Sequence, residues 1–386
     1  MMLDSTGKSM FRPAWATVDL GALRRNYALL KASLPAGTGI MAMVKADAYG
    51  HGAREVSHVL EAEGVCALGV ATVEEGVELR DSGISSPILV MGGLMGEGSP
   101  ASRRMVEARL TPVIHSSGVL DSIEAAAVAS GRTVDVHLKI DSGMSRLGVR
   151  PEVLGSLLAH IRQCPHLRVE GAMTHLADAG EEEFSERQLD TFLACRRSIE
   201  EELGSVPVWH VANSIAVMRG LATEFEGAAE SWVRPGLALY GECELDHPLR
   251  DRLDLVMNLE SRVMLLKRVP EGARVSYGGT FTARRKTRLA IVPIGYADGY
   301  PWSLSGKASV LLRGRRVPVA GRVTMDMIVL DVTDVEGVAV GDEVVLLGGQ
   351  GDQRIELREI AGWAGTIPYE ILCGISKRMP RIYSRD

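Results

Sequence analysis

The sequence predicts an α/β protein, in which an N-terminal TIM (β/α)8 barrel is followed by a mainly antiparallel β domain. Between residues 20 and 240, eight short apolar runs alternate with helical stretches, a pattern typical of a parallel sheet buried on both faces. Eight units suit a barrel better than an open doubly wound sheet, which stays the alternative because the last run contains Pro235 and Gly236. After Gly241 the helical periodicity nearly disappears and β-rich runs follow.

Each expected barrel strand is a continuous apolar run rather than an alternating one. The eight runs are residues 40–45, 66–71, 88–92, 111–115, 134–140, 169–175, 208–213 and 233–240. The clearest amphipathic stretches between them predict helices at residues 72–81, 117–130, 151–162 and 185–203.

The second half is a series of β-rich runs separated by Gly, Asp or Pro. They are residues 259–269, 274–281, 288–294, 307–313, 316–319, 327–332 and 343–347, with a helical pattern only at residues 358–365. We therefore expect a barrel domain over residues 14–245 and a β domain over residues 246–386, with residues 1–13 packing against the latter.

Composition excludes several classes of protein. The 386 residues carry a net charge of −6, which argues against a nucleic-acid partner. Five dispersed cysteines, with no CxxC pair and no histidine at metal-ligand spacing, indicate reduced thiols and no metal site. No apolar run approaches a membrane span, and the polar N-terminus has no signal-peptide core, so we expect a cytoplasmic protein.

Lys45 is the most informative residue. It closes a buried apolar run and precedes a turn that contains Tyr49, Gly50 and Gly52. Burial favours the uncharged amine, which is the form that attacks an aldehyde to make a Schiff base. The alternative is a lysine whose stem leaves the core and whose charged end reaches water.

Other polar residues also fall at or beyond the carboxyl ends of the expected strands, the face on which TIM-barrel active sites are built. They are Lys139, Arg146, His175, Asn213, Ser214, Arg234, Gly236 and Leu237. A serine at a helix start beside a glycine suits a phosphate, and an arginine suits a carboxylate. The alternatives are a helix-capping Ser214, a core His175 and a solvated Arg146. Together with Lys45, the set favours pyridoxal 5'-phosphate acting on an amino acid.

The chain resembles the alanine racemase family of fold-type III pyridoxal-phosphate enzymes. The matching segments are residues 44–52, 137–148, 233–241, 275–280, 293–299, 321–326 and 367–370. They follow in order along nearly the whole chain, which is far more specific than any one motif.

The resemblance implies a role for each matching residue. Lys45 would bind the cofactor and act as the base for D-alanine, and Tyr277, reaching the partner subunit's site in a head-to-tail homodimer, would be the base for L-alanine. Arg234 would bond the pyridine nitrogen, with His175 behind it. The remaining cofactor contacts would be Tyr49, Asn213, Ser214, Gly236, Leu237 and Tyr369, and the carboxylate contacts would be Arg146 and Met325. Lys139 matches a lysine that is carbamylated in some members.

Two positions depart from the family pattern without removing a base or a phosphate ligand. Thr324 stands where many relatives carry cysteine, and Asp47 stands where many carry asparagine. The family's reaction needs a base on each face of the α-carbon, and Lys45 and Tyr277 match both. The implied function is interconversion of L- and D-alanine, which supplies D-alanine for peptidoglycan.

Three other functions are open. A racemase of broader specificity, for serine, lysine or arginine, would share the fold and bases, although Tyr296 and Tyr369 would crowd a long side chain. A non-catalytic pyridoxal-phosphate carrier would be a lone barrel, which the predicted β domain argues against. A decarboxylase with the same domain pair would need motifs that do not occur here.

Overall fold

The computed structural model describes residues 11–94, 99–221 and 223–384. It divides into two compact units, and each is described by itself. The first contains Arg24–Ala48 and Ala53–Leu253; the second contains the described residues up to Leu23, Tyr49–Gly52, and the described residues from Asp254 onward.

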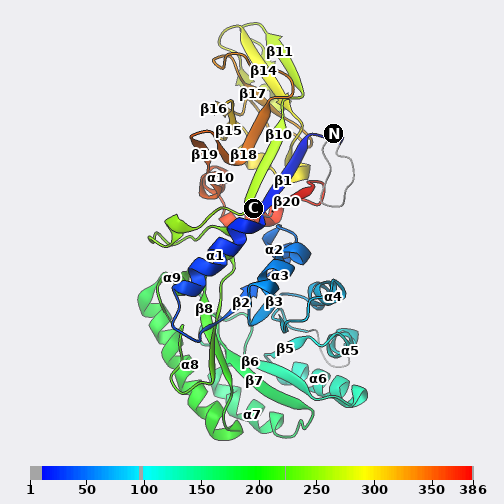
Figure 1. Cartoon of the computed structure of the whole chain (residues 1–386), viewed down its shortest axis with the longest axis vertical. Helices are drawn as coiled ribbons and strands as arrows, with labels where there is room; N and C mark the ends of the chain where they lie inside the picture. The colour runs from blue at the N-terminus through cyan, green and yellow to red at the C-terminus, as the bar shows by residue number, and fades with distance from the viewer. Residues whose placement is uncertain (1–10, 95–98, 222, 385–386) are drawn as a thin grey trace. The chain divides into compact units, whose positions relative to one another are not determined.

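The first unit is a closed barrel of parallel strands, which confirms the predicted fold class (Figure 1, blue to green). Its strands are β2 (Gly39–Met43), β3 (Ala67–Val70), β4 (Ile88–Val90), β5 (Thr111–Ile114), β6 (Val134–Lys139), β7 (Leu167–Met173), β8 (Val208–Asn213) and β9 (Glu230–Arg234). The ring closes where β2 pairs with β9, in the register Ile40↔Val233. All eight predicted runs therefore contribute a barrel strand.

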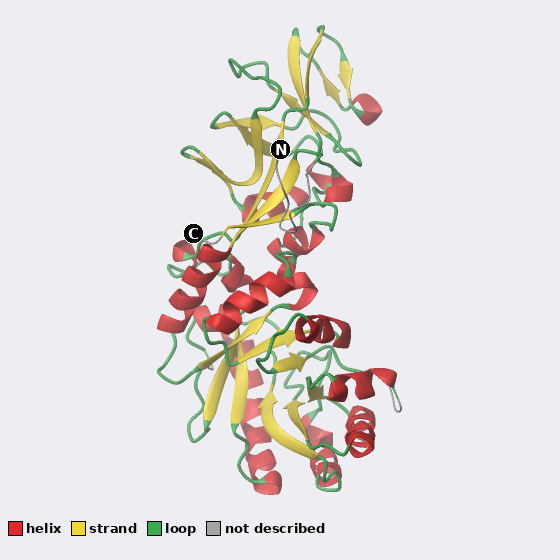
Figure 2. Ribbon diagram, turned by 45° about the vertical axis from the view of Figure 1, so that its right-hand side comes forward, coloured by secondary structure: helices red, strands yellow, loops and turns green. Residues whose placement is uncertain are grey.

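Helices cover the outer face of the barrel, as the red elements around the yellow strands in Figure 2 show. They are α1 (Leu20–Ala32), α3 (Ala53–Ala62), α4 (Val73–Asp81), α5 (Pro100–Glu107), α6 (Ser117–Ser130), α7 (Pro151–Ile161), α8 (Glu182–Leu203) and α9 (Ser214–Met218). Every residue of β3 and β4 is buried, because helices lie outside the strands and packed side chains fill the inside.

The eighth predicted strand is too long at its carboxyl end. The structure has β9 over Glu230–Arg234, then a 3₁₀ turn, η1 (Leu237–Tyr240). Pro235 has no N–H for the ladder, and the amide of Gly236 bonds a serine hydroxyl instead. Gly236 and Leu237 therefore lie beyond the strand. Lys45 and His175 likewise lie two residues past the ends of β2 and β7.

The second unit is mainly antiparallel, as predicted (Figure 1, yellow to red, with β1 in blue). One sheet has the order β16-β15-β18-β10-β1-β20, with β19 beside β18; another has the order β11-β14-β17, and β12 pairs with β13. The strands are β1 (Ala14–Asp19), β10 (Met257–Arg262), β11 (Leu265–Val269), β12 (Arg274–Val275), β13 (Phe281–Thr282), β14 (Thr287–Val292), β15 (Ser309–Leu312), β16 (Arg315–Pro318), β17 (Ile328–Asp331), β18 (Glu343–Gln350), β19 (Gln353–Ile355) and β20 (Arg381–Ser384).

This unit differs from the sequence-based prediction in its strands, its first residue and its helices. The predicted run 259–269 is two strands, β10 and β11, which belong to different sheets. The expected barrel domain starts at residue 14, but β1 lies in the second unit, where it pairs antiparallel with β10 and parallel with β20. The predicted helix near residue 358 is α10 (Leu357–Ala364), and a second helix, α11 (Pro368–Gly374), follows it.

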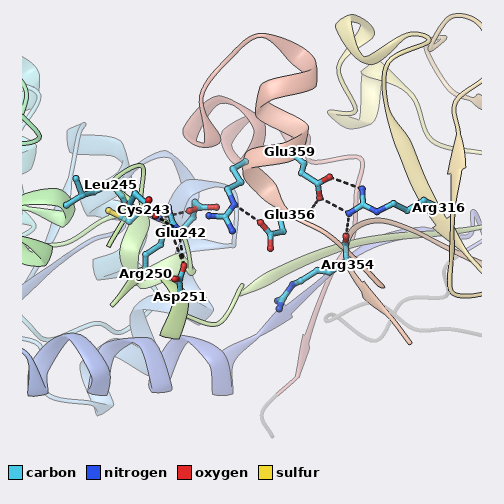
Figure 3. A network of polar contacts seen from close by, with 11 residues as sticks. Glu242, Cys243, Leu245, Arg250, Asp251, Arg316, Arg354, Glu356 and Glu359 are labelled. Atoms are coloured by element: carbon cyan, nitrogen blue, oxygen red, sulfur yellow. Dashed lines mark hydrogen bonds and ion pairs between the residues drawn. The ribbon is translucent and has the colours of Figure 1, made fainter. Parts of the chain in front are cut away.

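Ion pairs hold surface segments of each unit (Figure 3). In the second unit, Arg316 on β16 donates to both carboxylate oxygens of Glu359 on α10 and to the carbonyl of Arg354 on β19. In the first unit, Arg250 bonds Asp251 in the segment that follows the barrel. No helix among the described residues has the length and apolar character needed to cross a lipid bilayer.

Candidate active site

Four cationic side chains lie within electrostatic range of His175, near the carboxyl ends of the barrel strands. Desolvation, followed by the positive charges of Arg234, Lys139, Arg146 and Lys45, lowers the pKa of His175 to about 3. His175 is therefore neutral at pH 7. Burial, followed by the positive charges of Arg234, Arg146 and Lys45, lowers the pKa of Lys139 to about 8, and the carboxylate of Asp141 opposes this shift. Such a concentration of positive charge favours an anionic ligand.

Arg234 is held rigidly at the end of β9. It is 3% exposed, and its guanidinium donates to the carbonyls of Thr174 (2.7 Å) and Val211 (2.8 Å) and approaches His175 Nδ1 at 3.4 Å. Burial lowers its pKa to about 9, so that it remains a cation at pH 7. A fixed, charged donor of this kind suits an acceptor nitrogen or an anion.

Two buried histidines behind Arg234 were not identified from the sequence. Arg234 Nη1 lies 3.1 Å from Nδ1 of His210, and His210 Nε2 lies 2.8 Å from Nδ1 of His137. Arginine only donates, so His210 accepts at Nδ1 and carries its proton on Nε2, which it donates to His137. The sequence did contain a signal for them, because each histidine lies inside a mainly apolar strand, β6 or β8.

Ser214 joins two segments of the barrel rim. Its Oγ is the acceptor for the amides of Gly236 (3.0 Å) and Ala238 (3.3 Å). The helix α9 is instead capped by Asn213, whose Oδ1 accepts from the amide of Ala216 at 3.0 Å. The alternative reading of Ser214 as the helix cap is therefore wrong. The arrangement brings Ser214 against Gly236 and Leu237, the three positions expected to hold a phosphate.

Lys45 begins a turn of unusual backbone conformation. The four residues after it, Ala46 to Tyr49, all have φ between 53° and 54°. The left-handed helical conformation costs roughly 1–2 kcal/mol per non-glycine residue and persists only where the surroundings impose it. Asp47 contributes, because its Oδ1 accepts from the amide of Ala53 at 2.7 Å. An asparagine oxygen could make the same bond, which explains why this departure is tolerated.

Arg146 lies in an exposed loop that is shaped by Asp141. Asp141 Oδ1 accepts from the amides of Gly143 (3.1 Å) and Ser145 (2.9 Å). This local turn carries Arg146 to within electrostatic range of His175 and Lys139. The barrel unit thus brings together Lys45, Lys139, Arg146, His175, Asn213, Ser214, Arg234, Gly236 and Leu237.

The other four expected site residues belong to the second unit. Tyr49 is buried against Tyr369, with ring centroids 5.9 Å apart, and burial raises its pKa. Tyr277 lies in η3 (Tyr277–Gly279) and is 74% exposed, and Met325 is 52% exposed. Hydrogen bonds hold the segments that contain Tyr277 and Met325. Next to Tyr277, the Ser276 hydroxyl donates to the carbonyl of residue 322. The carbonyl of Met325 accepts from the amide of residue 297.

Two protein-family models match the chain over most of its length. Residues 18–244 match the alanine racemase N-terminal domain, and residues 256–383 match the C-terminal domain. The chain belongs to the alanine racemase family. Members of this family are isomerases, as expected from the resemblance.

Relatives in the alanine racemase family cover nearly the whole chain. The alanine racemase of Geobacter sulfurreducens is 43% identical over 379 residues, with 96% of this chain and 97% of the relative covered. That of Halothermothrix orenii is 40% identical, with 97% and 98% covered. The crystal structure of alanine racemase from Streptomyces lavendulae is 36% identical, with a TM-score of 0.90 and 98% of each chain covered.

Proposed function

We propose that this protein is a pyridoxal-phosphate-dependent alanine racemase (EC 5.1.1.1) that interconverts L- and D-alanine with Lys45 and Tyr277 as opposing bases. The observation that carries the proposal is the group of four cations, Lys45, Lys139, Arg146 and Arg234, around a neutral His175. Asp141 offsets part of the positive charge at Lys139, and a phosphate and a substrate carboxylate would neutralise the rest of the group.

The barrel residues fit the cofactor. Ser214 with the backbone of Gly236 and Leu237 would hold the phosphate, assisted by Asn213, Tyr49 and Tyr369. Lys45 would hold the aldehyde carbon, and Arg234 would donate to the ring nitrogen, since it stays protonated at pH 7. When bound, pyridoxal phosphate supplies an electron sink for the pair left on the α-carbon as its proton departs.

The proton transfers would fall to two side chains on opposite faces of the substrate. Lys45 Nζ would exchange the α-proton of D-alanine and Tyr277 Oη that of L-alanine, because racemisation removes a proton from one face and delivers one to the other. Arg146 and the backbone of Met325 would orient the substrate carboxylate.

A homodimer would complete each site. Tyr277 and Met325 are more than half exposed, so both side chains are accessible to a partner subunit. We propose that each subunit contributes them to its partner's barrel.

Lys139 is suited to carbamylation. It is 5% exposed, and its lowered pKa, about 8, leaves a fraction of uncharged amine at neutral pH that can attack carbon dioxide. A carbamate would replace a repulsive cation with an anion beside Arg146 and Arg234. We place the enzyme in the cytoplasm, where its D-alanine would serve peptidoglycan synthesis.

The test is direct. The purified protein, loaded with pyridoxal phosphate, is incubated with L-alanine and separately with L-serine, and optical rotation is followed. Loss of rotation with L-alanine alone supports the proposal. Comparable rates with both would indicate a broader racemase, and no loss with either would indicate a cofactor carrier and overturn the proposal.

A further inference from the structure

The carboxylate of Glu75 binds three backbone amides at the barrel rim. Its Oε1 accepts from the amide of Ala46 at 2.7 Å, and its Oε2 accepts from Ala71 (2.7 Å) and Thr72 (3.2 Å). Ala46 follows Lys45 directly, and the other two amides lie in the loop after β3. Glu75 therefore ties the segment that carries Lys45 to the next loop of the barrel.

The bond to Ala46 controls the direction of the Lys45 side chain. The amide of Ala46 shares a peptide plane with the carbonyl of Lys45, so fixing that N–H fixes ψ of Lys45. On the other side, the carbonyl of Val44, which shares a peptide plane with the amide of Lys45, accepts from the amide of Ala48 at 2.8 Å. With both neighbouring peptides anchored, the Cα–Cβ bond of Lys45 has one orientation.

The left-handed turn needs this anchor. Ala46, Asp47, Ala48 and Tyr49 all have positive φ, and within the turn the amide of Ala48 bonds the carbonyl of Val44 at 2.8 Å. The amide of Ala46, at the start of the turn, donates to the carboxylate of Glu75, which lies on α4. Without that acceptor the first residue of the turn can relax toward the right-handed region, and Lys45 moves with it.

We propose that Glu75 is a positioning residue that aims Lys45 at the cofactor aldehyde, an inference that rests on the proposed function. The role needs both carboxylate oxygens as acceptors, because the bonded groups on both sides are N–H donors. A glutamine in the same place offers one acceptor and one donor, so it must give up the amide of Ala46 or those of the β3 loop.

The experiment compares the wild type with Glu75→Gln and with Glu74→Gln as a matched control. Glu74 is exposed, is adjacent on the first turn of α4 and has the same charge. The dissociation constants of pyridoxal 5'-phosphate and of pyridoxine 5'-phosphate are measured for each protein. The second compound has an alcohol in place of the aldehyde, so it reports the ring and phosphate contacts without the link to lysine.

In Glu75→Gln we expect the affinity for pyridoxine phosphate to be unchanged and the binding of pyridoxal phosphate to be at least about 10-fold weaker. Racemisation should slow by about 10²-fold, which is the effect of displacing a reacting group by about 1 Å. Glu74→Gln should match the wild type in all three. If Glu75→Gln weakens the binding of both compounds equally, or weakens the binding of neither, the positioning role is overturned.

Two further outcomes are also decisive. If circular dichroism shows that Glu75→Gln is unfolded, Glu75→Asp, which keeps the charge but shortens the reach by one methylene, is judged by the same affinity ratio. If the wild type itself does not prefer the aldehyde, the proposed function is wrong and the role of Glu75 fails with it. A wild-type preference that the Glu75 variants retain overturns the role of Glu75 alone.

Discussion

The guanidinium of Arg234 donates to Nδ1 of His210 over 3.1 Å, inside the barrel, where both side chains are almost completely buried. Burial, the nearby charge of Arg234 and then His137 hold the pKa of His210 well below its usual range. Because the His210 ring is neutral, its Nδ1 can accept a hydrogen bond from Arg234.

Replacing His210 with leucine should destabilise the fold. The change leaves an N–H of Arg234 and Nδ1 of His137 without their partner, and an unsatisfied buried polar group costs about 1–3 kcal/mol. Urea unfolding monitored by circular dichroism measures the loss. His58→Ala, at an exposed site, is the control and should change the free energy of unfolding by less than about 0.5 kcal/mol. Equal effects of the two substitutions would contradict the assignment.

Stability should fall in mild acid because of His175. Its folded pKa, about 3, lies below the unfolded value of 6.5, so the unfolded chain binds the proton more readily. The contribution of neutral His175 to the free energy of unfolding is fully present above pH 6.5 and is lost as the pH falls toward 3. At pH 5 the loss is about 2 kcal/mol. His175→Gln, which cannot titrate, should show a smaller difference in unfolding free energy between pH 7 and pH 5. An unchanged difference would show that His175 does not titrate in this way.

Subunits with complementary defects should restore activity if the sites are shared. Lys45→Ala removes one proposed base and Tyr277→Phe the other, so each homodimer should be inactive. A mixed dimer should contain one site with both groups intact, and alanine racemisation should recover in part after mixing. Subunit exchange is verified independently with differently tagged chains. Verified exchange without recovery would mean that each chain supplies both bases to its own site.

Tyr277→Phe should affect the reactions of L-alanine and D-alanine to different extents. The variant should still bind pyridoxal phosphate and be yellow, because Lys45 and the phosphate contacts remain. Racemisation should fall by about 10²–10⁴, the usual effect of losing one acid–base group. Exchange of the α-proton in deuterated water should slow much more for L-alanine than for D-alanine. Similar slowing for both would contradict the assignment of Tyr277 to one face.

Local sequence pattern determined the barrel and most of its rim. Each barrel strand is a short apolar run, because both of its faces are buried, and such runs are visible without any knowledge of their neighbours. The strand ends located Lys45, Lys139 and Ser214 on one face, since parallel strands in a barrel all point the same way.

Only the tertiary structure decided the pairing of distant segments and the partners of buried polar groups. The strand β1 joins β10 and β20, which lie more than 230 residues further along the chain, and no local signal specifies such a partner. The contacts of His210 with Arg234 and of Glu75 with Ala46 also join different elements. Periodicity reports which face of an element is buried, whereas hydrogen-bond partners depend on where the closed barrel brings those faces together.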